Sequence, residues 1–290
     1  MICVCRKKEN YKRTVFSCFI QAVYLLEIDR QENRTEENAL APNWWRSFKY
    51  KLTQTLIDER DGSIFGAVLE WDRAAALADM ILIRPSGAPK AVLALRGTLL
   101  KGPTIRRDIE DDLRFLAWES LRGSVRFKVA LEALKSVAEM YGSSNICVAG
   151  HSLGAGFALQ VGKALAKEGF RSWIPLLGYK TSMGSKNWAP NLYVNNSDYI
   201  CCSYTDPDGA EDKKEADKEN AGPANGQAAV KLFVMSSKGK QKFLEAHGLE
   251  QWWSDDVQLQ QALHNSKLMS RQLKSLYTFP ATRPAQRMPQ

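Results

Sequence analysis

Three side chains that can act together in nucleophilic catalysis occur in this chain: Ser152, Asp198 and His247. A serine hydroxyl becomes a strong nucleophile when a histidine takes its proton, and a carboxylate can hold that histidine in the required tautomer. Ser152 is the central residue of the pentapeptide GHSLG at 150–154. The residue types therefore predict acyl-transfer chemistry at Ser152, provided that the fold brings the three side chains together.

The sequence around Ser152 favours a strand, a sharp turn and a helix. An apolar, β-prone run at 146–149 stops at a glycine, and a helix-favouring segment at 157–167 follows the second glycine. A serine nucleophile needs this context, because the glycines let strand and helix approach closely while the turn lifts the hydroxyl off the sheet. The N-terminus of the helix also offers N–H groups where negative charge develops. An ordinary glycine-rich turn is the alternative, because G-x-S-x-G also arises by chance.

Asp198 and His247 stand where the partners of such a serine are expected. Asp198 follows the apolar run 191–194, and the C-terminal end of a sheet strand suits the acid of a triad. A turn aspartate that caps the strand is the alternative. His247 follows a late apolar strand, whereas His264 lies in a segment that we expect to be helical, 255–277. We therefore take His247 as the candidate base and His264 as a residue of a helix face.

Thr98 closes a segment, 96–98, that follows a continuous apolar run at 91–95. The loop after such a strand can supply a donor to the oxyanion of an acyl-transfer reaction, so Thr98 is a candidate because of Ser152. Taken alone, Thr98 is a turn residue. Four acids at 108–112 could suggest a metal site, but no histidine converges on them, and a solvated helix face explains them better. We expect neither a metal nor a cofactor.

The other segments predict an α/β fold. Helices are expected at 11–30, 42–56, 106–116 and 125–141, and strands at 64–71, 80–83, 91–95, 146–149, 191–194 and 229–235. Because strands and helices alternate, we expect a mostly parallel central sheet with helices on both faces. Trp44 and Trp45 are expected in the core, and an acyl pocket lined by them is the alternative.

The composition fits one large globular domain. The chain has 290 residues, of which 44% are apolar, enough to bury a full core. No apolar run approaches the roughly 18 residues of a membrane span. The run 15–26 resembles a signal-peptide core, but no small-residue cleavage site follows it, so we expect a core helix and a cytoplasmic protein. Six cysteines in a chain of this length do not predict a disulfide framework.

Charge is unevenly distributed. The net charge is +8, and lysines and arginines gather near both ends. Basic ends could contact an anionic membrane surface, although solvated ends are the simpler interpretation, and no motif indicates nucleic acid. We divide the chain into a tail (1–10), one domain (11–277) and a disordered C-terminal tail (278–290). Within the domain, the charged segment 206–227 is expected to be a flexible surface insertion.

Taken together, the chain resembles the class 3 (fungal-type) lipase domain, and most closely the plant lipase-like branch of the α/β-hydrolase superfamily. The resemblance rests on the segments 94–98, 149–156, 195–200 and 247–253, and it spans roughly residues 11–277. It implies an α/β-hydrolase fold and a lipase or esterase that cleaves acyl-lipid esters.

The resemblance also implies a role for each candidate residue. Ser152 is the nucleophile, Asp198 is the triad acid and His247 is the base. The oxyanion donors are Thr98 and the backbone amide of Leu153. The acyl chain, the head group, a lid and the oligomeric state are left open.

One interval departs from the family pattern. Between the helix after Ser152 and the strand before Asp198, members of the family usually carry a further strand and helical material, and here that interval holds only 169–190. Missing or shortened elements would weaken the support beneath Asp198, and a misplacement of about 1 Å can cost on the order of a hundredfold in rate. The alternative function is therefore a catalytically impaired hydrolase-fold protein that binds a lipid or a protein partner.

Overall fold

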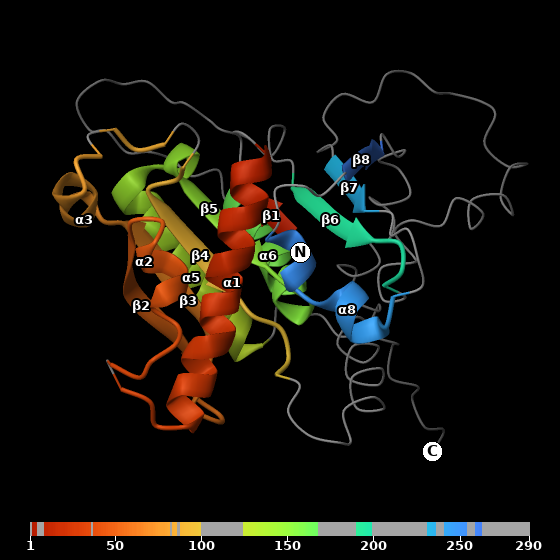
Figure 1. Ribbon diagram of the computed structural model, residues 1–290, viewed down its shortest axis with the longest axis horizontal. Helices are drawn as coiled ribbons and strands as arrows, with labels where there is room; N and C mark the ends of the chain where they lie inside the picture. Colours follow the sequence, from red (N-terminus) through yellow and green to blue (C-terminus); the bar gives the residue numbers. More distant parts are fainter. Residues whose placement is uncertain are drawn as a thin grey trace, which may run out of the picture.

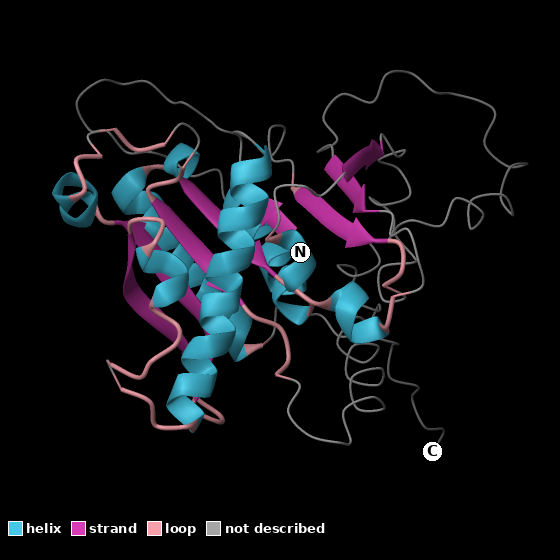
Figure 2. Cartoon of the chain, in the orientation of Figure 1, coloured by secondary structure: helices cyan, strands magenta, loops and turns pink. Residues whose placement is uncertain are grey.

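A computed structural model of the chain describes residues 2–4, 9–35, 37–81, 83–85, 88–99, 124–167, 190–198, 231–235, 241–253 and 259–262. In this part of the chain, helices cover both faces of one eight-stranded sheet (Figures 1 and 2). The helices are α1 (Glu9–Gln31), α2 (Asn43–Arg46), α3 (Arg73–Ala78), α5 (Val125–Tyr141), α6 (Leu153–Lys167) and α8 (Phe243–His247). The strands are β1 (Ile2–Val4), β2 (Tyr50–Asp58), β3 (Ser63–Trp71), β4 (Ala91–Leu95), β5 (Ile146–Gly150), β6 (Asn191–Asn195), β7 (Lys231–Met235) and β8 (Leu259–Ala262). The fold is mixed α/β.

The sheet contains both parallel and antiparallel pairs. Its strand order is β2-β3-β4-β5-β1-β6-β7-β8. The pairs β4–β5 and β6–β7 run parallel, whereas the pairs around β1, β3 and β8 run antiparallel. The prediction of a mostly parallel sheet was therefore wrong, although the prediction of helices on both faces was right.

Three strands that the sequence pattern did not predict, β1, β2 and β8, form four of the five antiparallel pairs of the described sheet. β2 pairs with β3 as a hairpin, β1 lies between β5 and β6 and β8 pairs with β7. The fifth pair, β3–β4, is antiparallel although α3 lies between the two strands in the chain, so alternation of strands and helices does not by itself fix parallel pairing. Part of the segment expected as an N-terminal tail, 1–10, is thus a strand of the sheet.

The helix expected at 42–56 ends after one turn, and a strand follows it. α2 ends at Arg46, and the backbone of Lys49 turns with a φ of 58°. From Tyr50 onward the chain is rich in β-branched side chains, and it forms a hairpin that turns at Gly62, where φ is 69°. The apolar spacing in this segment also fits a helix, so periodicity alone gave the wrong element.

Three smaller expectations also differ from the structure. Residues 80, 81 and 83, expected in a strand, lie outside the helices and strands. The segment 259–262, expected within a helix, is the edge strand β8. Cys147 is disulfide-bonded, which the spacing of the cysteines did not predict. By contrast, the helix predicted at 125–141 has the same bounds as α5, with Ser124 capping its N-terminus.

The core forms two apolar layers, one on each face of the sheet. Side chains of β4 and β5 point to the two faces in alternation, as strand geometry requires. Val92, Ala94 and Ala149 pack in the layer with α1, whereas Leu93 and Val148 pack in the layer with α5 and α6. Burying each large apolar side chain stabilises the fold by about 1.5–3 kcal/mol. This packing fixes α6 against the sheet and fixes the C-terminal ends of β4 and β5.

Glu27 joins α1 to the start of β3. Its carboxylate accepts hydrogen bonds from the backbone N–H of Ile64 at 2.8 Å, from Arg30 at 2.6 and 2.8 Å and from Gln31 at 2.8 Å. Burial opposes ionisation of this carboxyl, but the hydrogen bonds outweigh it and lower the pKa of Glu27 to about 2. The ionised carboxylate therefore stabilises the contact between α1 and the sheet.

This contact predicts a pH dependence of stability. A carboxyl whose pKa is lower in the folded state contributes stability above its ordinary pKa and loses that contribution as the pH falls. We expect the free energy of unfolding to fall between about pH 5 and pH 2, with Glu27 supplying about 2 kcal/mol of the loss. Urea denaturation at pH 6.5 and at pH 3 measures this change in the free energy of unfolding. Glu27→Gln should lower stability at pH 6.5 and flatten the pH dependence, whereas the exposed Glu139→Gln should do neither. Equal pH dependence in wild type and Glu27→Gln would contradict the assignment.

Several predicted features lie outside the described residues. They are the helix at 106–116, the interval 169–190 except its last residue, the insertion 206–227, His264 and the C-terminal tail 278–290. Among the described helices, none has the length and apolar character needed to cross a membrane.

Candidate active site

Ser152 lies at a strained turn between β5 and α6. Its φ is 53°, in the left-handed region that non-glycine residues seldom adopt. A Cβ placed on Gly150 would collide with the carbonyl of Gly154, and a Cβ on Gly154 would lie 2.5 Å from the carbonyl oxygens of Leu95 and Arg96. Strand and helix cross so closely that each of these positions accepts glycine alone. The geometry is that of a nucleophile elbow.

The C-terminal end of β4 lies against this turn. A Cβ on Gly97 would lie 2.7 Å from the Cβ of Ser152 and 2.9 Å from the carbonyl oxygen of His151. Arg96 is buried and donates to the carbonyl of Ile64 at 2.5 Å and to that of Gly97 at 2.8 Å. The guanidinium thereby fixes the segment that leads to Thr98. This arrangement brings Gly97, the residue before Thr98, beside Ser152, the residue before the start of α6 at Leu153.

His247 and Asp198 form a buried pair. Nδ1 of His247 lies 2.8 Å from Oδ2 of Asp198, and the two residues are 9% and 4% exposed. Because an ionised carboxylate only accepts, Nδ1 carries the proton and Nε2 is left with a lone pair that can accept one. His247 is the last residue of the short helix α8. Asp198 lies in the turn after β6, and its backbone N–H donates to the carbonyl of Asn195.

An amide network connects the acid turn with the segment that carries His247. The side-chain NH2 of Asn195, at the end of β6, donates to the side chains of Gln241 at 2.8 Å and Gln251 at 2.6 Å. The side chain of Gln251 in turn donates to the carbonyls of Ala246 at 2.6 Å and Gly248 at 2.8 Å. Asn195 itself is buried, at 1% exposed, and the network ties the turn that carries Asp198 to the segment that carries His247.

His151 connects the elbow with the base. Its Nε2 lies 2.7 Å from the carbonyl oxygen of His247, and the two rings are 4.9 Å apart. Burial, together with the neighbouring His247, holds the pKa of His151 well below its usual value. His151 is therefore neutral at neutral pH. Its contact places Ser152, the next residue, close to the His247–Asp198 pair.

The structure thus gathers the predicted site residues at one end of the sheet. Asp198 and His247 are hydrogen-bonded. Gly97, the residue before Thr98, lies against Ser152, and Leu153 follows Ser152 in the chain. Within the described part of the chain, the Ser152 hydroxyl makes no hydrogen bond to the His247 ring. Such bonds are often long without substrate and tighten when substrate binds.

Sequence reasoning missed the residues that support the site. Tyr24, which bonds to Gly97 and His151, was not singled out, because a tyrosine in an apolar helix carries no sequence signal of its own. His151, Asn195 and Gln251 lie in the segments on which the family resemblance rests, but no pattern in those segments assigned them a supporting role.

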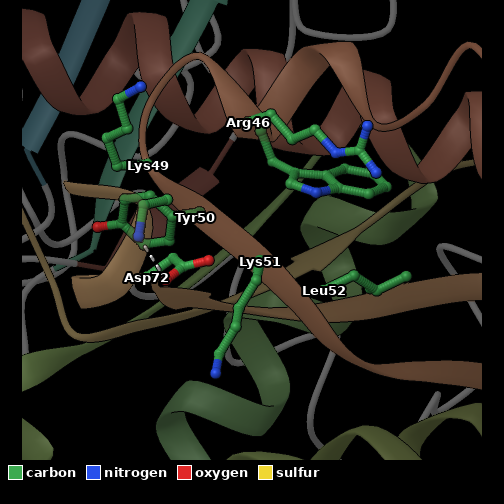
Figure 3. A pocket seen from close by; sticks show the side chains of 8 residues that line it. Arg46, Lys49, Tyr50, Lys51, Leu52 and Asp72 are labelled. Atoms are coloured by element: carbon green, nitrogen blue, oxygen red, sulfur yellow. Dashed lines mark hydrogen bonds between the residues drawn. The ribbon is translucent and has the colours of Figure 1, made fainter. Parts of the chain in front are cut away.

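A surface groove of about 520 Å³ lies elsewhere (Figure 3). It is bordered by α2, β2 and α3, and Arg46, Lys51 and Asp72 are among its lining residues (Figure 3). Lys51 of the groove pairs across β3 with the N-terminal end of β4. Ser152 follows β5 at the opposite end of the sheet, where the C-terminal ends of β4 and β5 lie side by side. The groove is therefore separate from the candidate site. Trp45 borders the groove but is buried in the core layer with α1, and Trp44 packs against the same layer, its ring 4.7 Å from that of Trp253. This packing favours the core interpretation of the tryptophan pair.

Comparison with known proteins finds one informative similarity. A GDSL esterase/lipase of Arabidopsis thaliana is 27% identical over 328 aligned residues, which cover 89% of this chain and 93% of that protein. No family model and no solved structure matches the chain. The similarity supports a lipase or esterase relationship at a distant level. The aligned length exceeds the 290 residues of this chain, so the relative has residues that this chain lacks.

Proposed function

We propose that this chain is a serine carboxylic ester hydrolase of the α/β-hydrolase type that acts on acyl lipids. The observation that carries the proposal is Ser152 in a left-handed turn beside the buried His247–Asp198 pair, 2.8 Å between Nδ1 and Oδ2. The similarity to an esterase/lipase supports it. Within the proposal, residues 11–277 form the hydrolase domain, and the segments 94–98, 149–156, 195–200 and 247–253 relate it to the plant lipase-like branch of the class 3 (fungal-type) lipases, a finer relationship than the similarity to a GDSL esterase/lipase supports. The proposed location is the cytoplasm, with peripheral contact at membranes through the basic ends.

The proposed reaction uses each residue in one role. Nε2 of His247 takes the hydroxyl proton of Ser152 while the oxygen attacks the ester carbonyl carbon. The N–H of Leu153 and Thr98 stabilise the oxyanion, at about 3–4 kcal/mol for a donor. His247 then returns the proton to the leaving alcohol. Water hydrolyses the acyl-enzyme by the same steps and releases the carboxylic acid, while Asp198 keeps the His247 tautomer fixed.

The chemistry needs no metal or organic cofactor. The buried residues of the site are explained by hydrogen bonds to one another.

A catalytically impaired protein that binds a lipid or a protein partner is the second candidate. Two observations favour it: the Ser152 hydroxyl is not hydrogen-bonded to His247 in the described structure, and the esterase relative has residues that this chain lacks. The two candidates make opposite predictions about turnover.

Turnover of p-nitrophenyl esters with acyl chains from acetate to palmitate separates them. The proposal predicts release of nitrophenol by the purified full chain, with the preferred chain length reporting the acyl pocket. His247→Ala serves as the inactive reference. Release no faster than with His247→Ala, from protein that unfolds cooperatively on heating, would contradict the hydrolase proposal and support the binding protein.

A further inference from the structure

Tyr24, on the middle of α1, reaches two parts of the candidate site at once. Its hydroxyl accepts a hydrogen bond from the backbone N–H of Gly97 at 2.8 Å and lies 3.0 Å from Nδ1 of His151. A hydroxyl has one proton to donate. Since Gly97 supplies its own proton, the Tyr24 proton is available for His151.

The partners of His151 fix the direction of these bonds. The carbonyl of His247, 2.7 Å from Nε2 of His151, can only accept, so Nε2 carries the ring proton. Nδ1 of the neutral ring is then an acceptor and receives the Tyr24 proton. The bonds form one directed chain: Gly97 N–H to Tyr24, Tyr24 O–H to His151, and His151 N–H to the carbonyl of His247.

This chain joins two parts of the site that lie far apart in the sequence. Gly97 leads to Thr98, the proposed oxyanion donor, and His247 is the proposed base. The carbonyls on either side of His247, those of Ala246 and Gly248, are held by Gln251. His151 binds the carbonyl of His247, which lies between them. Three consecutive backbone carbonyls around His247 therefore accept hydrogen bonds from side chains.

The chain also keeps a second positive charge away from the base. During the proposed reaction the His247 ring becomes an imidazolium, and the His151 ring lies 4.9 Å from it. A proton on Nδ1 of His151 would oppose that charge. The Tyr24 O–H occupies Nδ1, so His151 stays a neutral link.

We propose that Tyr24 is a positioning residue. It acts through His151 to keep Gly97, the residue before the proposed oxyanion donor Thr98, in a fixed position relative to the catalytic base His247. This inference rests on the proposed hydrolase function for its effect on rate. The bonding chain itself can be tested without catalysis.

The first test measures the tautomer. The chain has three histidines, His151, His247 and His264, so their ring 15N resonances can be assigned by substitution. We expect His151 to be neutral with its proton on Nε2 at pH 7, and to shift in Tyr24→Phe. A His151 ring that carries its proton on Nδ1, or that does not respond to Tyr24→Phe, would overturn the chain whether or not the protein hydrolyses esters.

The second test measures rate and stability together. Tyr24→Phe should lower kcat for a short p-nitrophenyl ester about 10- to 100-fold with little change in KM, because the ground-state pocket is unchanged and the alignment is not. Tyr50→Phe is the matched control: it also removes a buried hydroxyl, which donates to Pro89 at 2.6 Å, but outside the site. The two variants should lose similar thermal stability, and Tyr50→Phe should keep its kcat. Equal kcat in both variants would refute the positioning role.

A third comparison asks whether Tyr24 acts through His151. His151→Gln can keep both bonds, since a side-chain amide has an acceptor and a donor at the spacing of the two ring nitrogens, and it should retain most of the kcat. His151→Leu keeps neither and should lose as much as Tyr24→Phe or more. In the double variant Tyr24→Phe with His151→Leu, the loss should match that of His151→Leu alone. Additive losses would show that the two residues act separately.

If wild type shows no turnover while the ring nitrogen resonances of His151 follow the prediction, the hydrolase proposal fails and the bonding chain stands.

Discussion

Ser152→Ala is expected to lower ester turnover by at least about 10⁴-fold relative to wild type, since loss of a triad nucleophile leaves only binding and oxyanion contacts to act on the substrate. Stability should hardly change, because Ser152 is partly exposed and is not among the buried residues of the core. The measurement is kcat/KM for a short p-nitrophenyl ester, with thermal unfolding of the same samples.

Ser47→Ala provides the matched control. Ser47 is exposed and donates to the carbonyl of Asn43, far along the chain from the candidate site. It should keep the wild-type rate. A Ser152→Ala variant with more than a tenth of wild-type turnover would mean that the reaction occurs elsewhere on the molecule.

Gly154→Ala is expected to have the second large effect, on both stability and activity. The added Cβ would lie 2.5 Å from the carbonyl oxygens of Leu95 and Arg96, and neither backbone atom can move without separating β4 from α6. We expect a loss of about 2–4 kcal/mol in the free energy of unfolding, a range typical of overpacking at a rigid contact. Activity should fall below one hundredth of wild type, because the displaced helix carries Leu153 and Ser152 with it.

Gly62→Ala separates this steric effect from a general effect of losing a glycine. Gly62 has a φ of 69° and open space around it, so alanine there costs about 1–2 kcal/mol of backbone strain without a clash. It lies in the β2–β3 turn and should keep full activity. Full activity in Gly154→Ala would contradict the close crossing of β4 and α6.

The residues around Ser152 were predictable because they obey strong local rules. A β-prone run, two glycines and a helix-favouring run predict a strand, a tight turn and a helix, and the structure has β5, the turn at Ser152 and α6 in that order. The helix at 125–141 was equally clear, since Ser124 and Gly142 mark its two ends.

The rest of the sheet depended on contacts between distant segments. The pairing of β2 with β3 and the insertion of β1 between β5 and β6 depend on contacts between distant segments. The pairing of β2 makes a strand of a segment whose apolar spacing, starting near Pro42 and Trp44, indicated a helix. Local pattern cannot distinguish a helix from a strand in a short apolar run.

The supporting bonds of the site were hidden for a similar reason. Tyr24 and His151 are 127 residues apart in the sequence, and Asn195 and Gln251 are 56 apart. Nothing in either segment indicates its partner. The reacting groups could be proposed from residue types and order, whereas the side chains that orient them became visible once the fold was known.

The most direct test of the central claim is labelling with a fluorophosphonate, which reacts with an activated serine, followed by peptide mapping of the adduct. We expect one adduct, on Ser152, formed by the wild-type chain, absent in Ser152→Ala and strongly slowed in His247→Ala. Rapid labelling of His247→Ala, or an adduct on a different serine, would contradict the proposed triad. No labelling of a wild-type chain that unfolds cooperatively would contradict it as well, and would leave a hydrolase-fold binding protein as the better description.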